Sequence, residues 1–216
     1  MAARERILER IRRRQGRGGS APGDAESDLV RTYIKAHPRG PLPDVGADLL
    51  ARFSGRAVAL ASTVDSVGDE RDVPAAVARY LDAHGLPNSG CVWPQLAGLD
   101  WAGAGLRLEA RAAKGDDAIG VSGAYCAIAE TGTLCVLSGA DTPASVSLVP
   151  ETHIAVLRAA RIVAHMEDAW DLMRAELGQL PRAVNYISGP SRTADIEQTV
   201  VLGAHGPSRV HVIVVA

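Results

Sequence analysis

Short apolar runs alternate with amphipathic segments along most of this 216-residue chain. The uninterrupted apolar runs are only about five residues long, as at Val212–Ala216, which suits buried strands. Between them lie segments whose apolar residues recur every three or four positions, the spacing of a helix that packs on one face. This alternation predicts an α/β domain with a mostly parallel sheet.

The strongest helix signal is Met166–Leu177, where Met166, Ala169, Trp170 and Met173 share one side and Gly178 follows the end. Asp72–His84 is a second predicted helix, with a capping aspartate and a proline in its first turn. A third helix is expected over Ala194–Leu202. The predicted strands are Arg56–Ala61, Cys91–Trp93, Leu106–Ala112, Leu134–Leu137, Ile154–Leu157, Val184–Ile187 and Val210–Val215.

The N-terminal segment differs from the rest of the chain. Seven arginines and two glutamates among residues 1–20 give that stretch a net charge of +5. Residues 4–14 predict a short helix, and a further helix is possible at 27–36 among glycines and prolines. We therefore expect an Arg-rich helix and flexible linker over 1–45 and an α/β domain over 46–216. The arm is either a frayed, solvated helix or a docking element for an acidic surface on a partner.

Composition excludes several classes of function. The overall charge is -2 and aromatic residues make up 4%, which favours neither nucleic-acid binding nor base stacking. Cys91, Cys126 and Cys135 are 35 and 9 residues apart without a CxxC pair, so we expect no metal site and no cofactor. The odd cysteine count and the absence of an apolar signal core or a membrane span predict a cytoplasmic protein.

A first candidate loop for chemistry is Ala127–Thr133, whose sequence is AIAETGT. The carboxylate of Glu130 interrupts an apolar stretch, and partial burial suits such a group for proton transfer or nucleophilic attack. Thr131 and Thr133 add hydroxyls, and Gly132 permits a turn or a close approach to a ligand. The structural alternative is a turn in which Glu130 accepts backbone hydrogen bonds.

A second candidate loop is ISGPSRTADIE at 187–197, where a strand is expected to run into a helix. Ser191, Arg192 and Thr193 would lie at the start of that helix, and free amides beside hydroxyls and an arginine form an anion site. Asp195 in the first turn would compete with an anion, so an ordinary capped helix is equally consistent.

The third candidate loop is LGAHGP at 202–207, which holds His205 between glycines and a proline. Its imidazole could serve as an acid, a base or a ligand. His153, which precedes an apolar strand, is an equal candidate for these roles. There is no HxxxH or HxH pair, so the signal for a metal is weak.

Taken together, four segments resemble the lactate-utilisation protein C family of LUD-domain proteins: AIAETGT at 127–133, SLVPETHI at 147–154, ISGPSRTADIE at 187–197 and GAHGPSRVHVIVV at 203–215. The resemblance covers residues 116–216, with the motifs in the family's order. It implies a fold similar to the ribose phosphate isomerase and CoA-transferase group, with helices on both faces of the sheet. It also implies iron–sulfur partner proteins that, with this chain, oxidise L-lactate to pyruvate.

The resemblance carries the family's recurrent positions over to residues of these three loops. Among these positions we expect Glu130, His205 and Asp195 as catalytic groups. We expect the remaining ones as the substrate or anion site: Thr131, Gly132, Thr133, Ser191, Arg192, Thr193 and Gly206. All of them are expected to converge on one cleft.

Three hypotheses about function remain open. The first is a non-redox component of an iron–sulfur-containing lactate oxidation complex that could bind a small carboxylate. The alternative is a stand-alone enzyme or binder for an acyl-CoA or sugar phosphate, with Glu130 as nucleophile. The third is a regulatory or structural module without a small ligand.

Overall fold

The structure is a computed structural model that describes residues 3–16, 22–193 and 201–216. The chain divides into two compact units, Met1–Leu42 and Pro43–Ala216. In the first unit, helix α1 spans Ala3–Arg14 and helix α2 spans Asp24–Ala36, and neither contains a buried residue. Both predicted N-terminal helices are therefore confirmed as helices, with α2 starting three residues earlier than 27.

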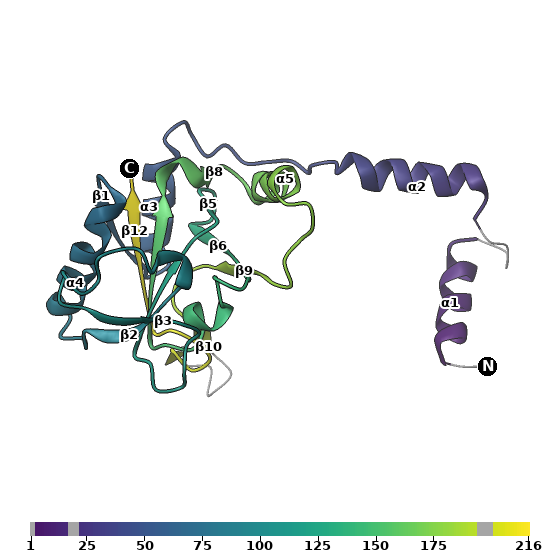
Figure 1. The fold of residues 1–216 in the computed structure, drawn as a ribbon. Coiled ribbons are helices and arrows are strands. Elements are labelled where there is room, and N and C mark those ends of the chain that lie inside the picture. The colour runs from purple at the N-terminus through teal and green to yellow at the C-terminus, as the bar shows by residue number, and fades with distance from the viewer. Residues whose placement is uncertain (1–2, 17–21, 194–200) are drawn as a thin grey trace. The chain divides into compact units, whose positions relative to one another are not determined.

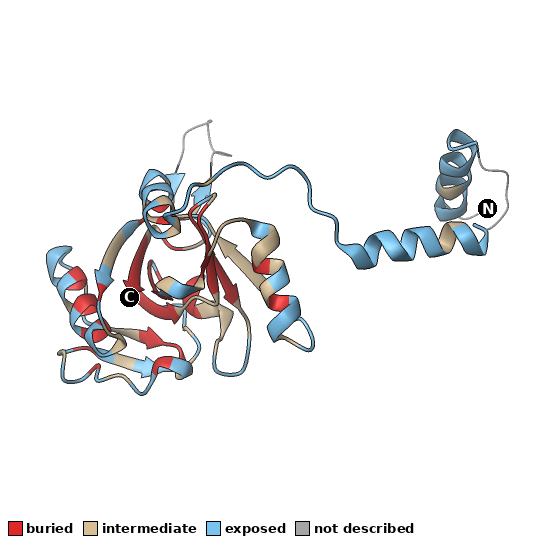
Figure 2. Ribbon diagram, turned by 90° about the horizontal axis from the view of Figure 1, so that it is seen from above, coloured by how far each residue is buried: buried red, intermediate tan, exposed pale blue. Residues whose placement is uncertain are grey.

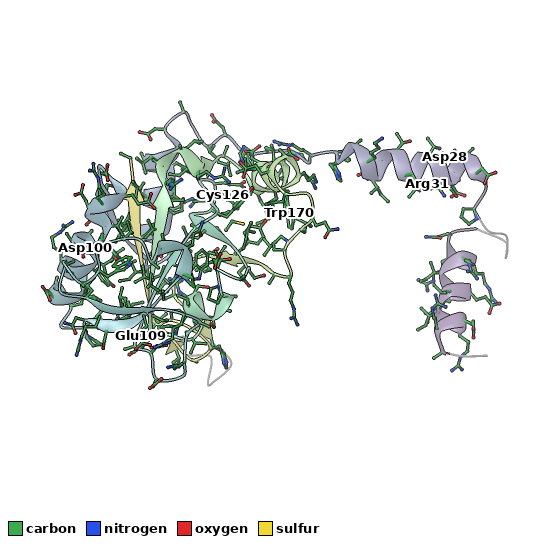
Figure 3. All side chains as sticks on the ribbon, viewed as in Figure 1. Asp28, Arg31, Asp100, Glu109, Cys126 and Trp170 are labelled. Carbon is green, nitrogen blue, oxygen red and sulfur yellow. The ribbon has the colours of Figure 1, made fainter. Side chains whose placement is uncertain are left out.

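Ion pairs on the exposed faces support both helices of the first unit. Arg13 pairs with Glu9 four positions earlier on α1 at 3.2 Å. On α2, Arg31 pairs with Asp28 at 3.2 Å, and Figure 3 labels these two residues. Such exposed pairs each add only a few tenths of a kcal/mol. In the described part of the chain, no helix has the length and apolar character needed to cross a membrane.

The second unit is built on a parallel sheet with the strand order β1-β12-β7-β4-β2-β3 (Figure 1). Parallel pairing buries the central strands on both faces, which is why they consist of continuous apolar runs. The strands are β1 (Thr63–Val67), β2 (Ser89–Val92), β3 (Arg107–Ala110), β4 (Ile119–Gly123), β7 (Thr152–Arg158) and β12 (Arg209–Val215).

Alternate residues of the central strands pack on opposite faces of the sheet. Ile154 and Ile213 belong to one core cluster, which includes the apolar side of α4 (Val73–Ala83). Their neighbours Ala155 and Val212 belong to a second cluster with Phe53 of α3 (Leu49–Ala59). The prediction of an α/β fold with helices on both faces of a mostly parallel sheet is thus confirmed. In Figure 2 the buried residues concentrate in the strands between these layers.

A smaller sheet, which the sequence analysis did not predict, completes the second unit. Its strand order is β8-β5-β6-β9, with β8 parallel to β5 and the other pairs antiparallel. Cys126 and Cys135 are cross-strand neighbours in it and pack against Ala169 and Met173 of α5. The elements are β5 (Cys126–Ile128), β6 (Thr133–Leu137), β8 (Ile162–Val163), β9 (Val184–Ile187) and α5 (Met166–Glu176).

Most predicted elements lie where the structure has them, but two do not. Arg56–Ala61 is not a strand: residues 56–59 end helix α3, because Asp48 caps the helix and Phe53 and Ala57 bury one side of it. In the predicted helix Ala194–Leu202, Val201–Leu202 form strand β11, and residues 194–200 lie outside the described residues. Strand β11 pairs with β10 (Arg192–Thr193). Short 3-10 turns occur at Glu70–Asp72, Pro94–Leu96, Ala144–Ser147 and Ala159–Arg161.

Candidate functional site

The first predicted loop is the turn of a β-hairpin between β5 and β6. Ile128 and Thr133 are cross-strand partners, and the Gly132 N–H donates to the Ile128 carbonyl at 2.9 Å. Gly132 has φ +69°, and a Cβ there would lie 2.6 Å from the Ala57 nitrogen of α3. The glycine is thus required both by the turn and by a close approach, and the approaching group is the backbone of α3.

Glu130 is held in this turn by a histidine that the sequence analysis did not select. Its Oε2 lies 3.1 Å from Nδ1 of His165, and the two side chains are 28% and 12% exposed. The Glu130 N–H donates to the Ala164 carbonyl, and Arg56 Nε donates to the Glu130 carbonyl at 3.2 Å. A carboxylate oriented against an imidazole in this way can fix the ring's tautomer or exchange a proton with it.

The sequence marks His165 as the residue before a helix. His165 precedes the predicted helix at Met166, and its N–H donates to Asp168 Oδ2 at 2.9 Å, which is the N-terminal capping interaction of α5. The sequence alone could predict the capping position of His165. It could not predict the contact of His165 with Glu130, which is 35 residues away.

A line of hydroxyl groups joins the first loop to the second. Thr131 Oγ1 lies 2.7 Å from Thr133 Oγ1, which lies 2.7 Å from Ser188 Oγ. Thr133 is buried, whereas Thr131 and Ser188 are exposed. The structure therefore brings the ETGT turn and the start of the SGPSRT segment together, as neighbours on β6 and β9 require.

The end of helix α3 is the platform on which both loops pack. Arg192 Nη2 donates to the Leu60 carbonyl at 2.7 Å, and a Cβ on Gly189, with φ +82°, would lie 2.3 Å from the same oxygen. A cation at a helix C-terminus is favoured by the exposed carbonyls there. Arg192 is thus positioned by a helix C-terminus.

The predicted anion site at a helix start is not seen in the described residues. Arg192 and Thr193 form β10, which pairs antiparallel with β11. Asp195 lies outside the described residues.

The third loop adjoins the second at its backbone. Ser191 N–H donates to the Pro207 carbonyl at 2.8 Å, and a Cβ on Gly206 would lie 3.3 Å from Ser191 Cβ. His205 itself is exposed and lines a shallow hollow of about 510 Å³ with Asp116 and Glu151. The residues lining this hollow include neither Glu130 nor Arg192. The assignment of His205 to a shared cleft therefore stays a prediction.

His153 lies inside the sheet. It is fully buried, its Nε2 lies 2.7 Å from Ser122 Oγ, and burial lowers the pKa of its ring to about 4. The imidazole is therefore neutral near pH 7 and has no surface on which to meet a substrate.

The carboxyl edge of the parallel sheet holds a cavity that the sequence analysis did not identify. Its volume is about 440 Å³, and Trp93, Gly123 and Arg158 line it at or just after the ends of β2, β4 and β7. Tyr125 and Arg161 form another part of its wall.

A compact ion-pair network fixes that wall. Arg161 donates to both carboxylate oxygens of Glu176 at 2.6 and 2.9 Å, and its guanidinium lies 4.5 Å from the centre of the Tyr125 ring. The Tyr125 hydroxyl donates to Glu176 at 2.7 Å. Hydrogen bonds from Arg161 and Tyr125 lower the pKa of Glu176 to about 2, while burial and the bond to Glu176 raise the pKa of Tyr125 to about 12.

Comparisons with known proteins agree with this architecture. A family model described as the LUD domain matches residues 94–215. A protein named Lactate utilization protein C from Bacillus subtilis is 35% identical over 128 residues, covering 57% of this chain and 53% of that protein. One of the same name from Halalkalibacterium halodurans is 41% identical over 114 residues, covering 51% and 49%. The chain spans about half the length of the curated relatives it matches.

A solved structure is also similar. A crystal structure of a DUF162 family protein from Deinococcus radiodurans superposes with a TM-score of 0.59 and 26% identity. The match covers 82% of this chain and 100% of that one.

Proposed function

The chain belongs to the LUD domain family, and from that membership we propose that it serves in lactate utilisation. The observation that carries the proposal is the similarity, at 35 to 41% identity, to proteins named Lactate utilization protein C from several bacteria. These names support the lactate hypothesis over an acyl-CoA or sugar-phosphate enzyme.

Within such a system we assign the chain a non-redox role. Conversion of L-lactate to pyruvate removes two electrons and two protons, so the electrons need an acceptor. The resemblance to the lactate-utilisation protein C family implies iron–sulfur partner proteins, and these would accept the electrons. The chain would then bind or position the substrate, or hold the partners together, in the cytoplasm.

The candidate substrate groups lie on the two loops that α3 positions. Arg192 would hold the carboxylate of a small acid, because its side chain is exposed and its one hydrogen bond to the described residues is from Nη2 to Leu60. Glu130, oriented by His165, would take the proton of the hydroxyl group, the proton from the Cα–H bond would pass to solvent, and the two electrons would pass to the iron–sulfur partner proteins. The hydroxyls of Thr131, Thr133 and Ser188 connect the two loops. His205 and Asp195 remain predicted catalytic groups.

The N-terminal arm is the part of the chain proposed to meet a partner. On α1, Ile7 and Ile11 are 60% and 47% exposed among six arginines and two glutamates. An apolar stripe flanked by cations suits an acidic surface with an apolar centre.

Reconstitution with the iron–sulfur partners tests the proposal. We expect Glu130→Gln to reduce the rate of lactate-dependent reduction of an electron acceptor by about 100-fold. Arg192→Ala should raise the lactate concentration needed for half-maximal rate by about tenfold. The matched controls are Glu109→Gln and Arg174→Ala, which remove one partner of an exposed ion pair elsewhere and should leave the rate unchanged.

The possible outcomes separate the parts of the proposal. Normal turnover with both Glu130→Gln and Arg192→Ala contradicts the substrate site and leaves a scaffold. Normal turnover when the whole chain is omitted contradicts the role in lactate utilisation itself.

A further inference from the structure

The cavity at the carboxyl edge lies where an α/β sheet usually binds its ligand. Strands β2 and β4 are neighbours, but the chain leaves β2 toward β3 on one side and later continues from β4 to β7 on the other. Such a reversal of direction leaves a crevice beyond the strand ends. Trp93 follows β2 and Gly123 ends β4, and both line the cavity.

One part of the cavity wall is apolar and rigid. Trp93 is 2% exposed, and its Nε1 donates to the Pro143 carbonyl at 3.0 Å, which fixes the plane of the ring. Leu96, Leu137 and Val156 line the cavity as well. Trp93, Leu96 and Val156 are each less than 10% exposed, so the apolar part of the wall is tightly packed and favours a ligand with an apolar body.

The other part of the wall is charged, and its two arginines differ. Arg161 is committed to Glu176 through two short bonds and to the Tyr125 carbonyl at 2.9 Å. Arg158 has one described ion pair, from Nη2 to Glu70 at 2.9 Å, and their side chains are 68% and 37% exposed. An exposed pair of this kind is worth about 1 kcal/mol at most, so a ligand anion can replace Glu70 as the partner of Arg158.

Two further observations define the ligand. Of the charged residues in the lining, Arg161 is neutralised by Glu176, so Arg158, whose partner is the lining residue Glu70, is the cation that a ligand anion can reach. The volume of about 440 Å³ is in the range of cavities that bind drug-sized molecules, and exceeds what a three-carbon acid would fill.

We propose that this cavity binds an organic anion with an apolar body, whose head group pairs with Arg158 in place of Glu70 and whose body lies beside Trp93, Leu137 and Val156. The inference rests on the cavity alone and does not depend on a role in lactate utilisation.

The full chain labelled with ¹⁵N allows a direct test, because Trp93 reports from the cavity wall through its indole N–H. We choose 2-naphthoate as the probe, 2-naphthamide as its uncharged counterpart and 2-naphthyl phosphate as the arm that distinguishes a phosphate head from a carboxylate. Trp93→Phe identifies the indole signal. We expect 2-naphthoate to shift this signal saturably and to bind at least about fivefold more tightly than the amide.

Matched variants locate the head group. Arg158→Met should weaken 2-naphthoate about fivefold and leave 2-naphthamide unchanged. Arg79→Met is the control, because Arg79 forms a similar exposed pair with Asp65 at 3.1 Å but does not line the cavity. Glu70→Gln should act in the opposite direction and tighten 2-naphthoate about twofold, since Arg158 loses its competing carboxylate.

An unmoved Trp93 signal with both acids, equal affinity for acid and amide, or equal effects of Arg158→Met and Arg79→Met would each contradict the proposal. The dispersion of the ¹⁵N spectrum shows in the same experiment that every variant is folded.

Discussion

His153 and His211 are neutral side chains inside the parallel sheet. His211 is 4% exposed, stacks on Tyr80 at 4.0 Å between ring centres, and lies 2.8 Å from Thr63 Oγ1 through Nδ1. Burial lowers the pKa of each ring to about 4, against about 6.5 in an unfolded chain. Between these two values the unfolded state binds more protons than the folded state.

Stability should therefore rise with pH from about 4 to 6.5 and be lost as the pH falls through that window. Each histidine contributes a loss of about 2 kcal/mol in the free energy of unfolding between pH 7 and pH 5. His153→Gln should remove about half of this pH dependence, as measured by urea unfolding at the two pH values. His205→Gln, at an exposed position, is the control, and a wild-type slope in His153→Gln would contradict the assignment.

At the scale of elements, the packing of the hairpin turn on α3 decides where the candidate loops lie. Gly132 and Gly105 both have left-handed backbone, with φ of +69° and +76°. A Cβ on Gly132 would meet the Ala57 nitrogen at 2.6 Å, whereas one on Gly105 would meet nothing within 4 Å. Substitutions at Gly105 and Gly132 therefore separate the cost of left-handed backbone strain from the cost of steric overlap with α3.

We expect Gly105→Ala to lower the free energy of unfolding by about 1 to 2 kcal/mol through backbone strain alone. Gly132→Ala should cost about 1 to 3 kcal/mol more, because α3 must move away from the turn. Urea unfolding of both variants measures the difference. Equal losses of unfolding free energy in the two variants would show that overlap with α3 adds no cost at Gly132.

Sequence patterns predict some of the helices and strands and miss others. A one-sided apolar stripe and a glycine after the last turn predict α4 and α5, and apolar runs predict β9 and β12. The predicted cap of α4 is wrong, because the Asp72 side chain makes no capping hydrogen bond. Strand β1 has the sequence TVDSV and lies at the edge of the sheet, so its polar residues obscured it. Residues 56–61 combine alanine with branched residues and fit either structure locally. In the structure residues 56–59 belong to helix α3, because the helical conformation buries Phe53 and Ala57 in the core.

At the scale of the whole molecule, the two units differ in what holds them together. Neither α1 nor α2 contains a buried residue, whereas every core cluster of the described chain belongs to Pro43–Ala216. Exposed helices without a packed face depend on their own weak propensity.

Removal of residues 1–42 should therefore change the melting temperature of the remaining chain by less than about 2 °C. Differential scanning calorimetry of the full and shortened chains measures this. A large fall in melting temperature would show that the arm contributes to the core of the second unit, against the proposed division into an arm and an α/β domain.

What the sequence determined by itself is local: helices, strands and caps arise from residues two to four positions apart, and the family motifs are contiguous segments. The α/β class and the identity of Glu130, Arg192 and their neighbours as candidate residues follow from that information. The tertiary structure alone decided which groups meet. Glu130 and His165 are 35 residues apart, Thr133 and Ser188 55, and Arg192 and Leu60 132. Contacts over such separations depend on strand order and on packing around a shared core, which no local pattern encodes.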